Sequence, residues 1–231
     1  MLIRNICDLS KETSKKTRIQ SKILKLDTIL SAFGNSTTPF NKDASCFIKY
    51  SELQINEQGR LAGMKLIDYL LEKSRISGSL DRGACFHIFY HLLENASQEE
   101  RLQLHLSDPA HFSFLNGSKM ASFAQGQGAA VFENIKQVLK VFGIGKRLQY
   151  QIWQLLATIL HMGNIKFEKN NSGNSKEACY IKNIHQLQLV ASLLGVDPSD
   201  LQNILTCKTK IVNIKTNCRL GTTIFPFFSI H

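Results

Sequence analysis

Two neighbouring stretches, Ile29-Leu-Ser-Ala-Phe-Gly-Asn35 and Asn41-Lys-Asp-Ala-Ser-Cys-Phe47, decide how this chain of 231 residues is interpreted. The first ends a segment whose apolar residues recur at helical spacing, namely Ile19, Ile23, Leu26, Leu30 and Phe33. This period predicts a helix over residues 18–33, and Gly34-Asn35 is typical of a left-handed helix end. The second stretch lies in a polar loop that contains Pro39.

Downstream of this loop, the sequence predicts a β-hairpin followed by helices. Residues 47–55 and 60–71 are rich in Ile, Leu, Tyr and Phe, and Asn56-Glu-Gln-Gly59 separates them as a turn. Helical periodicity or capping residues then recur at 87–95, 131–142, 147–162, 184–194 and after Asp197-Pro198, with a short strand expected at 165–167. In the 147–162 helix, we expect one side to face the core: Leu148, Ile152, Leu155, Leu156, Ile159 and Leu160.

Composition and charge restrict the class of protein. The chain is 43% hydrophobic and 20% charged, which is typical of a folded globular protein. No apolar run reaches the roughly 18 residues of a membrane span, and Asp8 interrupts any secretory signal, so we expect an intracellular protein. Of the net charge of +10, much lies at the two ends of the chain. Because no aromatic residue precedes Phe33, we expect no nucleic-acid partner.

The motifs of common catalytic and metal sites do not occur. The 6 cysteines include no C-x-x-C pair, and neither Gly126-Gln-Gly128 nor Gly143-Ile-Gly145 continues as a phosphate-binding loop. No G-x-S-x-G elbow is present. His87 and His91 lie one helical turn apart, but without an adjacent glutamate, so helix packing explains them better than a metal. We therefore expect no catalytic residue in this chain.

The order of residues around the polar loop resembles that in myosin motor domains. The stretches 29–35 and 41–47 are similar to the segment that runs from a long helix into switch I, the loop that clasps nucleotide and magnesium. Similar segments follow in the family's order: Glu57-Gln-Gly-Arg-Leu-Ala-Gly63, Tyr69-Leu-Leu-Glu-Lys-Ser-Arg75, Phe86-His-Ile-Phe-Tyr-His-Leu-Leu93, Ile159-Leu-His-Met-Gly-Asn-Ile165 and Leu193-Leu-Gly-Val-Asp197. Four pieces favour the motor-like domain of some fungal chitin synthases: Asn41-x-Asp-Ala-Ser45, Gly59-Arg-Leu-x-Gly63, Glu99-Glu-Arg-Leu-Gln-Leu-His105 and Cys207-Lys-Thr-Lys-Ile-Val212.

This resemblance implies an α/β, predominantly helical fold that is a fragment of a P-loop NTPase motor head. The fragment would be the upper 50-kilodalton region with two transducer strands. Residues 1–212 would form this partial domain, with the switch I loop at 35–47, the β-hairpin at 47–71 and a helical region at 83–206. The stretch 213–231 does not match the family pattern and is expected to be a foreign tail. The P-loop and the Asp-x-x-Gly-Phe-Glu of switch II do not occur in this sequence.

The resemblance assigns a nucleotide site to Asn41, Asp43, Ala44 and Ser45. Asn41 would contact the phosphates of Mg-ATP, and Ser45 would ligate Mg²⁺. The loop departs from the family pattern in three places. Asp43 stands where Asn is usual, Ala44 replaces a Ser that would position the attacking water, and Cys46 replaces the Arg that would pair with a switch II glutamate. Because a neutral thiol cannot hold a carboxylate bidentately, we expect weak hydrolysis or none even in the complete parent.

The resemblance thus implies a fragment of a cytoplasmic, cytoskeletal motor whose parent is an actin-activated ATPase. Binding of ATP and of actin filaments would belong to that parent. The parent would include the remainder of the motor head, and it could also carry a fused chitin synthase domain. Two alternatives stay open. One is a nucleotide-free helical protein-interaction module, which would be a degenerate motor, and the other is an unrecognised hydrolase, which has the least support.

Overall fold

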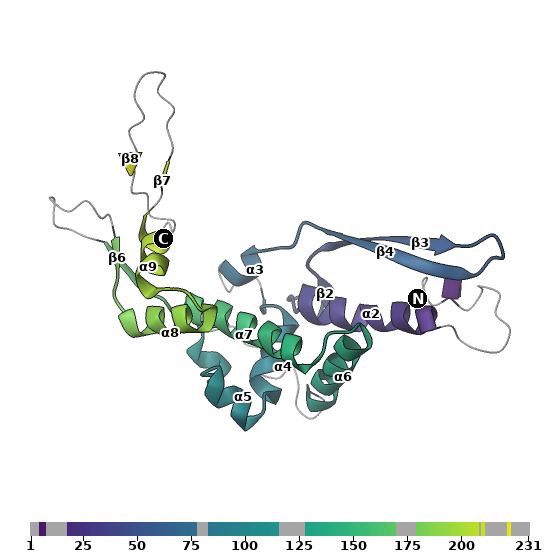
Figure 1. Cartoon of the computed structure of the whole chain (residues 1–231), viewed down its shortest axis with the longest axis horizontal. Coiled ribbons are helices and arrows are strands. Elements are labelled where there is room, and N and C mark those ends of the chain that lie inside the picture. The colour runs from purple at the N-terminus through teal and green to yellow at the C-terminus, as the bar shows by residue number, and fades with distance from the viewer. Residues whose placement is uncertain are drawn as a thin grey trace, which may run out of the picture. The chain divides into compact units, whose positions relative to one another are not determined.

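The computed structural model describes residues 5–7, 18–77, 83–115, 128–169, 179–207, 209–210 and 221–222. The chain divides into two units, Met1–Trp153 and Gln154–His231, and the boundary falls within helix α7, Lys146–Gly163. In the described part, helices predominate and the sheets are small two-stranded pairs (Figure 1). This agrees with the predominantly helical fold that the sequence predicts.

Unit 1 combines helices with two short antiparallel pairs of strands. Its other helices are α2 (Arg18–Gly34), α3 (Ser74–Ser77), α4 (His87–Asn95), α5 (Gln98–Gln103), the 3₁₀ turn η2 (Pro109–His111) and α6 (Gly128–Val141). Its strands are β1 (Asn35–Ser36), β2 (Ala44–Ser45), β3 (Ile48–Ile55) and β4 (Leu61–Tyr69).

The β3–β4 hairpin packs one face against helix α2, which runs alongside it (Figure 1). The register runs from Ile48 opposite Tyr69 to Ile55 opposite Leu61, with a shift after Gln54. A small apolar cluster joins Ile23 of α2 to Leu61 of β4, with Leu53 and Met64 packed against it. Because side chains alternate along a strand, the residues that flank Leu53 in β3 and Met64 in β4 face away from α2.

Gly34 ends α2 for a reason that the sequence does not reveal. The left-handed helix end expected there is wrong, because Gly34 does not have a positive φ and Asn35 continues directly into β1. A Cβ on Gly34 would instead lie 2.1 Å from Cε1 of Phe47. Glycine is needed here because the aromatic ring packs against the backbone.

Helix α4 forms the centre of unit 1. Seven consecutive residues, from His87 to Leu93, are buried. Large apolar side chains from α6 and α7 are buried in the same unit, and the rings of Phe132 and Trp153 are 5.1 Å apart. This dense packing fixes the start of α4, which lies next to the loop between β1 and β2.

Two further expectations from the sequence need correction. In α7, Leu148 and Leu155 are 52% and 55% exposed, whereas Trp153, Ala157 and Leu160 are buried. The expected strand at 165–167 is displaced, because β5 covers Phe167–Lys169. Helix α5 is not among the expected helices, although Ser97 and Glu100 form a capping box at its start.

Unit 2 contains the second part of α7, a β-hairpin and two helices. The elements are β5, β6 (Cys179–Ile181), α8 (Ile184–Leu194) and α9 (Pro198–Thr206). The core includes Ile181, Leu187, Val190 and Leu201. As expected, α8 ends at Gly195, which has a φ of 69°, and Asp197 caps α9 by accepting a hydrogen bond from the Ser199 amide.

Beyond α9, the structure describes only two short strands. The backbone of β7 (Thr209–Lys210) pairs antiparallel with that of β8 (Gly221–Thr222). The rest of the stretch 213–231, which the sequence analysis treats as a foreign tail, lies outside the described residues. Among the helices of the described part, none is long and apolar enough to cross a membrane.

Candidate nucleotide-binding loop

A short antiparallel pair of strands brings together the two ends of the loop that the sequence singles out. Asn35 in β1 lies opposite Ser45 in β2, and Ser36 lies opposite Ala44. The amide of Cys46 extends this ladder by donating to the Gly34 carbonyl at 2.9 Å. Residues 37–43 therefore form a closed turn rather than an open connection.

Hydrogen bonds inside the turn fix its conformation. The Thr37 hydroxyl donates to the Lys42 carbonyl at 2.7 Å, and the Thr38 amide donates to the Asn41 carbonyl at 2.8 Å. The Asn41 side-chain oxygen accepts the Asp43 amide at 3.0 Å, as in an Asx turn. These bonds, all within the turn, hold it in the conformation observed.

The loop is also attached to the body of unit 1. The Ala84 amide donates to the Thr37 carbonyl at 2.9 Å, and Ser36 forms an isolated β-bridge with Phe86. Gly83 has a φ of +109°, and a Cβ on it would lie 2.4 Å from the Thr37 carbonyl oxygen. This close approach requires glycine. Ser36 and Thr37 are almost fully buried, at 0% and 1% exposure.

Asn41 and Ser45 lie on the exposed side of this turn. The Ser45 hydroxyl donates its proton to the Phe47 carbonyl at 3.0 Å, which leaves the oxygen lone pairs available to a cation. Asn41 uses its side-chain oxygen in the turn, and its amide nitrogen has no hydrogen-bond partner among residues 18–77. The turn therefore presents one hard oxygen ligand and one amide donor.

This donor set fits a magnesium ion that is shared with phosphates. Among the described residues, no cluster of three His, Cys, Asp or Glu side chains surrounds a potential metal position. Mg²⁺ bound to a nucleotide needs only one or two protein ligands, because phosphate oxygens and water complete the octahedron. A single Ser45 hydroxyl meets this requirement for one side of such a site.

Asp43 has its carboxylate next to two buried side chains. Its Oδ1 accepts a hydrogen bond from Asn35 Nδ2 at 2.8 Å and lies 3.3 Å from His87 Nε2. The Asp43 side chain is 64% exposed, whereas that of His87 is 6% exposed. Burial lowers the pKa of His87, and the Asp43 carboxylate partly opposes this effect. From the sequence alone, only a packing role is expected for His87, because nothing local links it to Asp43.

Cys46 faces the inside of the protein. It is 6% exposed, and its Sγ lies 2.9 Å from the Ser36 hydroxyl and 3.5 Å from the Ala44 carbonyl oxygen. Ala44 is half-buried beside it. Cys85 is a further buried thiol in this region, and burial raises its pKa to about 12. Neither thiol offers an exposed charged group.

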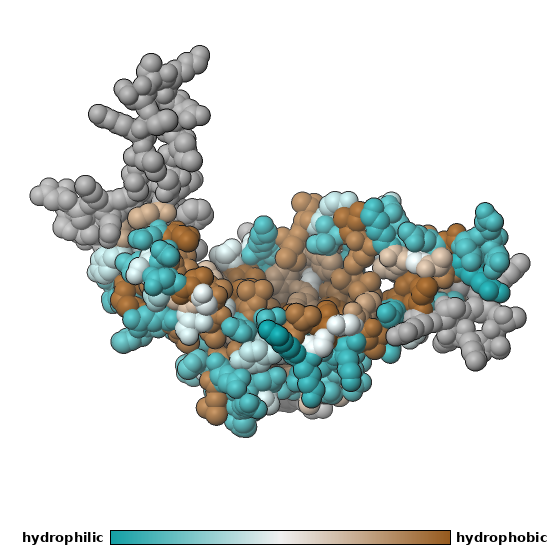
Figure 2. All heavy atoms as spheres, in the orientation of Figure 1, coloured by the Kyte–Doolittle hydropathy of each residue, from teal (hydrophilic) through white to brown (hydrophobic). Residues whose placement is uncertain are grey.

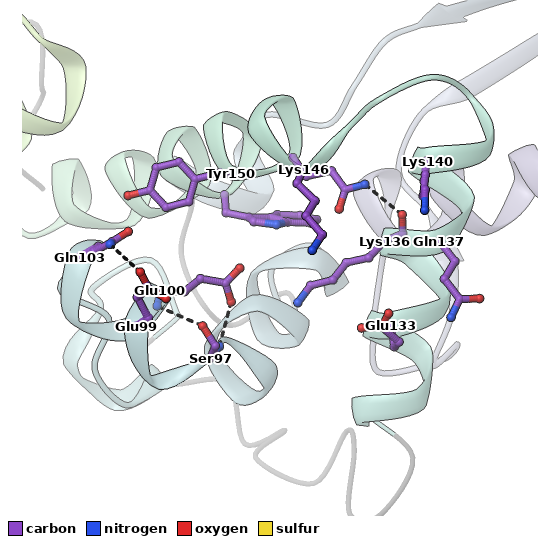
Figure 3. Close-up of a pocket in the computed structure, with 12 residues that line it drawn as sticks. Ser97, Glu99, Glu100, Gln103, Glu133, Lys136, Gln137, Lys140, Lys146 and Tyr150 are labelled. Atoms are coloured by element: carbon purple, nitrogen blue, oxygen red, sulfur yellow. Dashed lines mark hydrogen bonds between the residues drawn. The ribbon is translucent and has the colours of Figure 1, made fainter.

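A separate cavity lies between α5, α6 and the first turns of α7 (Figure 3). It measures about 850 Å³. Lys136 and Lys146 direct their ammonium groups into it, with Tyr150 along one side (Figure 3). Of the acidic residues at its edge, Glu100 already accepts the Ser97 amide in the capping box. The cavity is thus lined by three lysines and three glutamates beside an aromatic wall.

Comparisons with known proteins agree on one family. A family model described as the myosin head (motor domain) matches residues 1–223, which extends past residue 212. The chain is 34% identical over 204 residues to a myosin-I heavy chain of Dictyostelium discoideum, covering 88% of this chain and 9% of the relative. It is 36% identical over 214 residues to chitin synthase 8 of Mycosarcoma maydis, with 92% and 10% covered.

A third relative, chitin synthase 5 of Cryptococcus neoformans, is 38% identical over 205 residues, covering 88% of this chain and 10% of the relative. The chain therefore spans about a tenth of the length of these three proteins.

Proposed function

Because this chain belongs to the myosin head (motor domain) family, we propose that its residues 35–47 supply switch I to the nucleotide site of an actin-based motor. The chain is a myosin-like motor fragment. The observation that carries the proposal is the closed turn, which exposes Asn41 and Ser45 with the atoms that a phosphate and a magnesium ion require. In the full head, this fragment corresponds to the upper 50-kilodalton region and two transducer strands, β3 and β4, of a P-loop NTPase.

Each residue of the turn has a defined role in this proposal. Asn41 donates its side-chain amide to the phosphates of ATP, and Ser45 holds Mg²⁺ by its hydroxyl oxygen. The ion, when bound, neutralises negative charge on the phosphate oxygens. Ala44 lacks a hydroxyl to orient water, and Cys46 cannot form an ion pair across the site. We therefore expect binding of Mg-ATP with slow hydrolysis or none.

Activity and partners belong to the longer protein in this proposal. Actin filaments and the remainder of the motor head are the partners, and the location is the cytoskeleton, by analogy with relatives named myosin. Two of the compared relatives are named chitin synthases. We extend the proposal to a parent that carries such a domain after its motor head.

The test is to exchange the matching segment of the Dictyostelium myosin-I heavy chain for this chain and to titrate fluorescent ATP in the presence of Mg²⁺. We expect saturable binding that Asn41→Ala and Ser45→Ala each weaken by about 10-fold or more, since each removes a contact to a charged group. Ser51→Ala, an exposed position in β3, is the matched control and should bind normally. A folded exchange protein that binds no nucleotide would refute the proposal.

The alternative of a nucleotide-free interaction module has one observation in its favour, the cavity between α5, α6 and α7. Lys136 and Lys146, whose ammonium groups point into the cavity, would pair with carboxylates of an acidic peptide, against the repulsion of the three glutamates in the lining. Titration of a labelled oligoglutamate peptide tests this, with Lys136→Glu combined with Lys146→Glu as the loss variant. Absence of saturable binding to the unaltered chain rejects this second candidate.

A further inference from the structure

The carboxylate of Asp43 joins the two ends of the loop to the start of α4, which lies far from the loop in sequence. Asn35 belongs to β1, Asp43 to the turn and His87 to the first residue of α4. Both nitrogen atoms approach the same oxygen, Asp43 Oδ1, at 2.8 Å from Asn35 and 3.3 Å from His87. The exposed turn is thereby connected through one atom to two buried side chains.

Asn35 is held in one orientation by this contact. Its side-chain oxygen is buried and accepts no hydrogen bond from the described residues. A reversed amide would place that oxygen against the carboxylate, which is repulsive, so the bond from Nδ2 to Asp43 fixes the amide. Asn35 is 6% exposed, and it is paired in the ladder that closes the turn.

The charge of Asp43 matters because its Oδ1 accepts the hydrogen bond from Asn35 and lies 3.3 Å from His87 Nε2, a close contact that does not meet hydrogen-bond geometry. A carboxylate oxygen accepts the Asn35 donor more strongly than an amide oxygen would, since charge-assisted hydrogen bonds are roughly twice as strong as neutral ones, and its negative charge also attracts the N–H edge of the His87 ring. Burial lowers the pKa of His87, and His91, one turn further along α4, also has a pKa lowered by burial and then by His87. The neutral imidazole that results is a donor when its proton is on Nε2.

From this arrangement we propose that Asn35 and His87 are positioning residues that hold switch I from inside the chain, through Asp43. The inference rests on the proposed function only for the identity of the loop. Cys46, which replaces the arginine of the family pattern, has its thiol at Ser36 on the inside of the protein. The latch formed by Asn35, Asp43 and His87 thus replaces an ion pair across the nucleotide site, and the turn keeps its conformation before nucleotide arrives.

Amide hydrogen exchange on the unliganded 231-residue chain at constant pH tests the latch. The reporters are the Thr38, Asp43 and Cys46 amides, which donate hydrogen bonds inside the turn or its ladder. We expect Asp43→Ala and His87→Phe to accelerate their exchange by about 10-fold, while amides of α6 keep their rates, since only the attachment of the turn is lost. His87→Gln, which retains a side-chain N–H donor, should restore slow exchange.

The matched control is His91→Phe, which changes a second buried histidine on the same helix. It should leave exchange in the turn unaltered. The latch is refuted if the turn amides are unprotected in the unaltered chain, or if His87→Phe and Asp43→Ala leave them protected. It is also refuted if turn and α6 amides accelerate together and His87→Gln does not restore them. Because no nucleotide is present in this experiment, its outcomes are independent of whether the myosin-I heavy chain that carries this chain as a replaced segment binds ATP.

Discussion

The buried thiol of Cys46 leaves little room for a larger or charged side chain at this position. The Cys46 thiol is 6% exposed and packs against the buried Ser36 hydroxyl. We expect Cys46→Arg to lower the free energy of unfolding by about 3 kcal/mol, because it overfills the site and buries a charge. Thermal denaturation followed by circular dichroism measures this. Cys46→Ser, which keeps the size and the hydrogen bond, should melt near the unaltered chain, and an equally stable arginine variant contradicts the buried thiol.

The two buried histidines of α4 predict how stability depends on pH. Burial lowers the pKa of both His87 and His91 below the ordinary value of 6.5. Below that pH the unfolded chain binds protons that the folded chain does not, so the free energy of unfolding should fall as the pH decreases from 7 to 5. Urea unfolding at several pH values measures the slope. His91→Phe should reduce it, and a chain as stable at pH 5 as at pH 7 would show the histidines to be accessible.

At the scale of the elements, the contact between Gly34 of α2 and the Phe47 ring predicts that adding a single methyl group at position 34 lowers the stability of the fold. A Cβ at position 34 would lie 2.1 Å from the ring, so Gly34→Ala must displace the Phe47 ring from its packing. We expect a loss of about 1–3 kcal/mol in the free energy of unfolding, which is usual for overpacking. Gly145→Ala is the control, because nothing lies within 4 Å of a Cβ there. Equal melting temperatures for the two variants would argue against the contact.

Elements whose signals are local were predictable from the sequence, and contacts across the chain were not. Gly195 and Asp197-Pro198 mark the end of α8 and the start of α9 by backbone preference and capping alone. Periodicity predicts α7 as a helix and places Leu156 and Leu160 correctly in the core, but it wrongly includes Leu148 and Leu155, which look as apolar as the buried Trp153. A period specifies a helix, whereas its packed face depends on neighbours that are distant in sequence.

The candidate site follows the same division. Asn41 and Ser45 were assigned by resemblance to a family motif, and the turn exposes both. His87 was assigned to packing, because its contact with Asp43 depends on the attachment of β1 to the start of α4 at Ser36 and Phe86. No spacing rule reports such a bridge. The S-x-x-E pattern at Ser97 was, by contrast, a local signal for α5 that was overlooked.

At the scale of the whole molecule, the described residues leave the β3–β4 hairpin incompletely covered. It is a sheet of two strands, so within the described residues both outer edges lack a neighbouring strand. On the face away from α2, Ile48, Tyr50 and Tyr69 are 54%, 50% and 49% exposed, and Leu70 next to them is 81% exposed. Figure 2 shows apolar side chains among hydrophilic ones over this hairpin. Unpaired strand edges beside exposed apolar residues promote association with other chains.

We therefore expect the 231-residue chain to self-associate as its concentration rises from low to high micromolar, in sedimentation velocity or light scattering. Ile48→Lys combined with Tyr69→Lys should shift it towards monomer, since the two residues are cross-strand partners and charges on an edge oppose pairing. Lys65→Gln is the matched control on the same face, where Lys65 lies opposite Glu52 and 3.8 Å from its carboxylate. It should not reduce association. A chain that stays monomeric at every concentration would mean that this face of the hairpin is covered by its own residues.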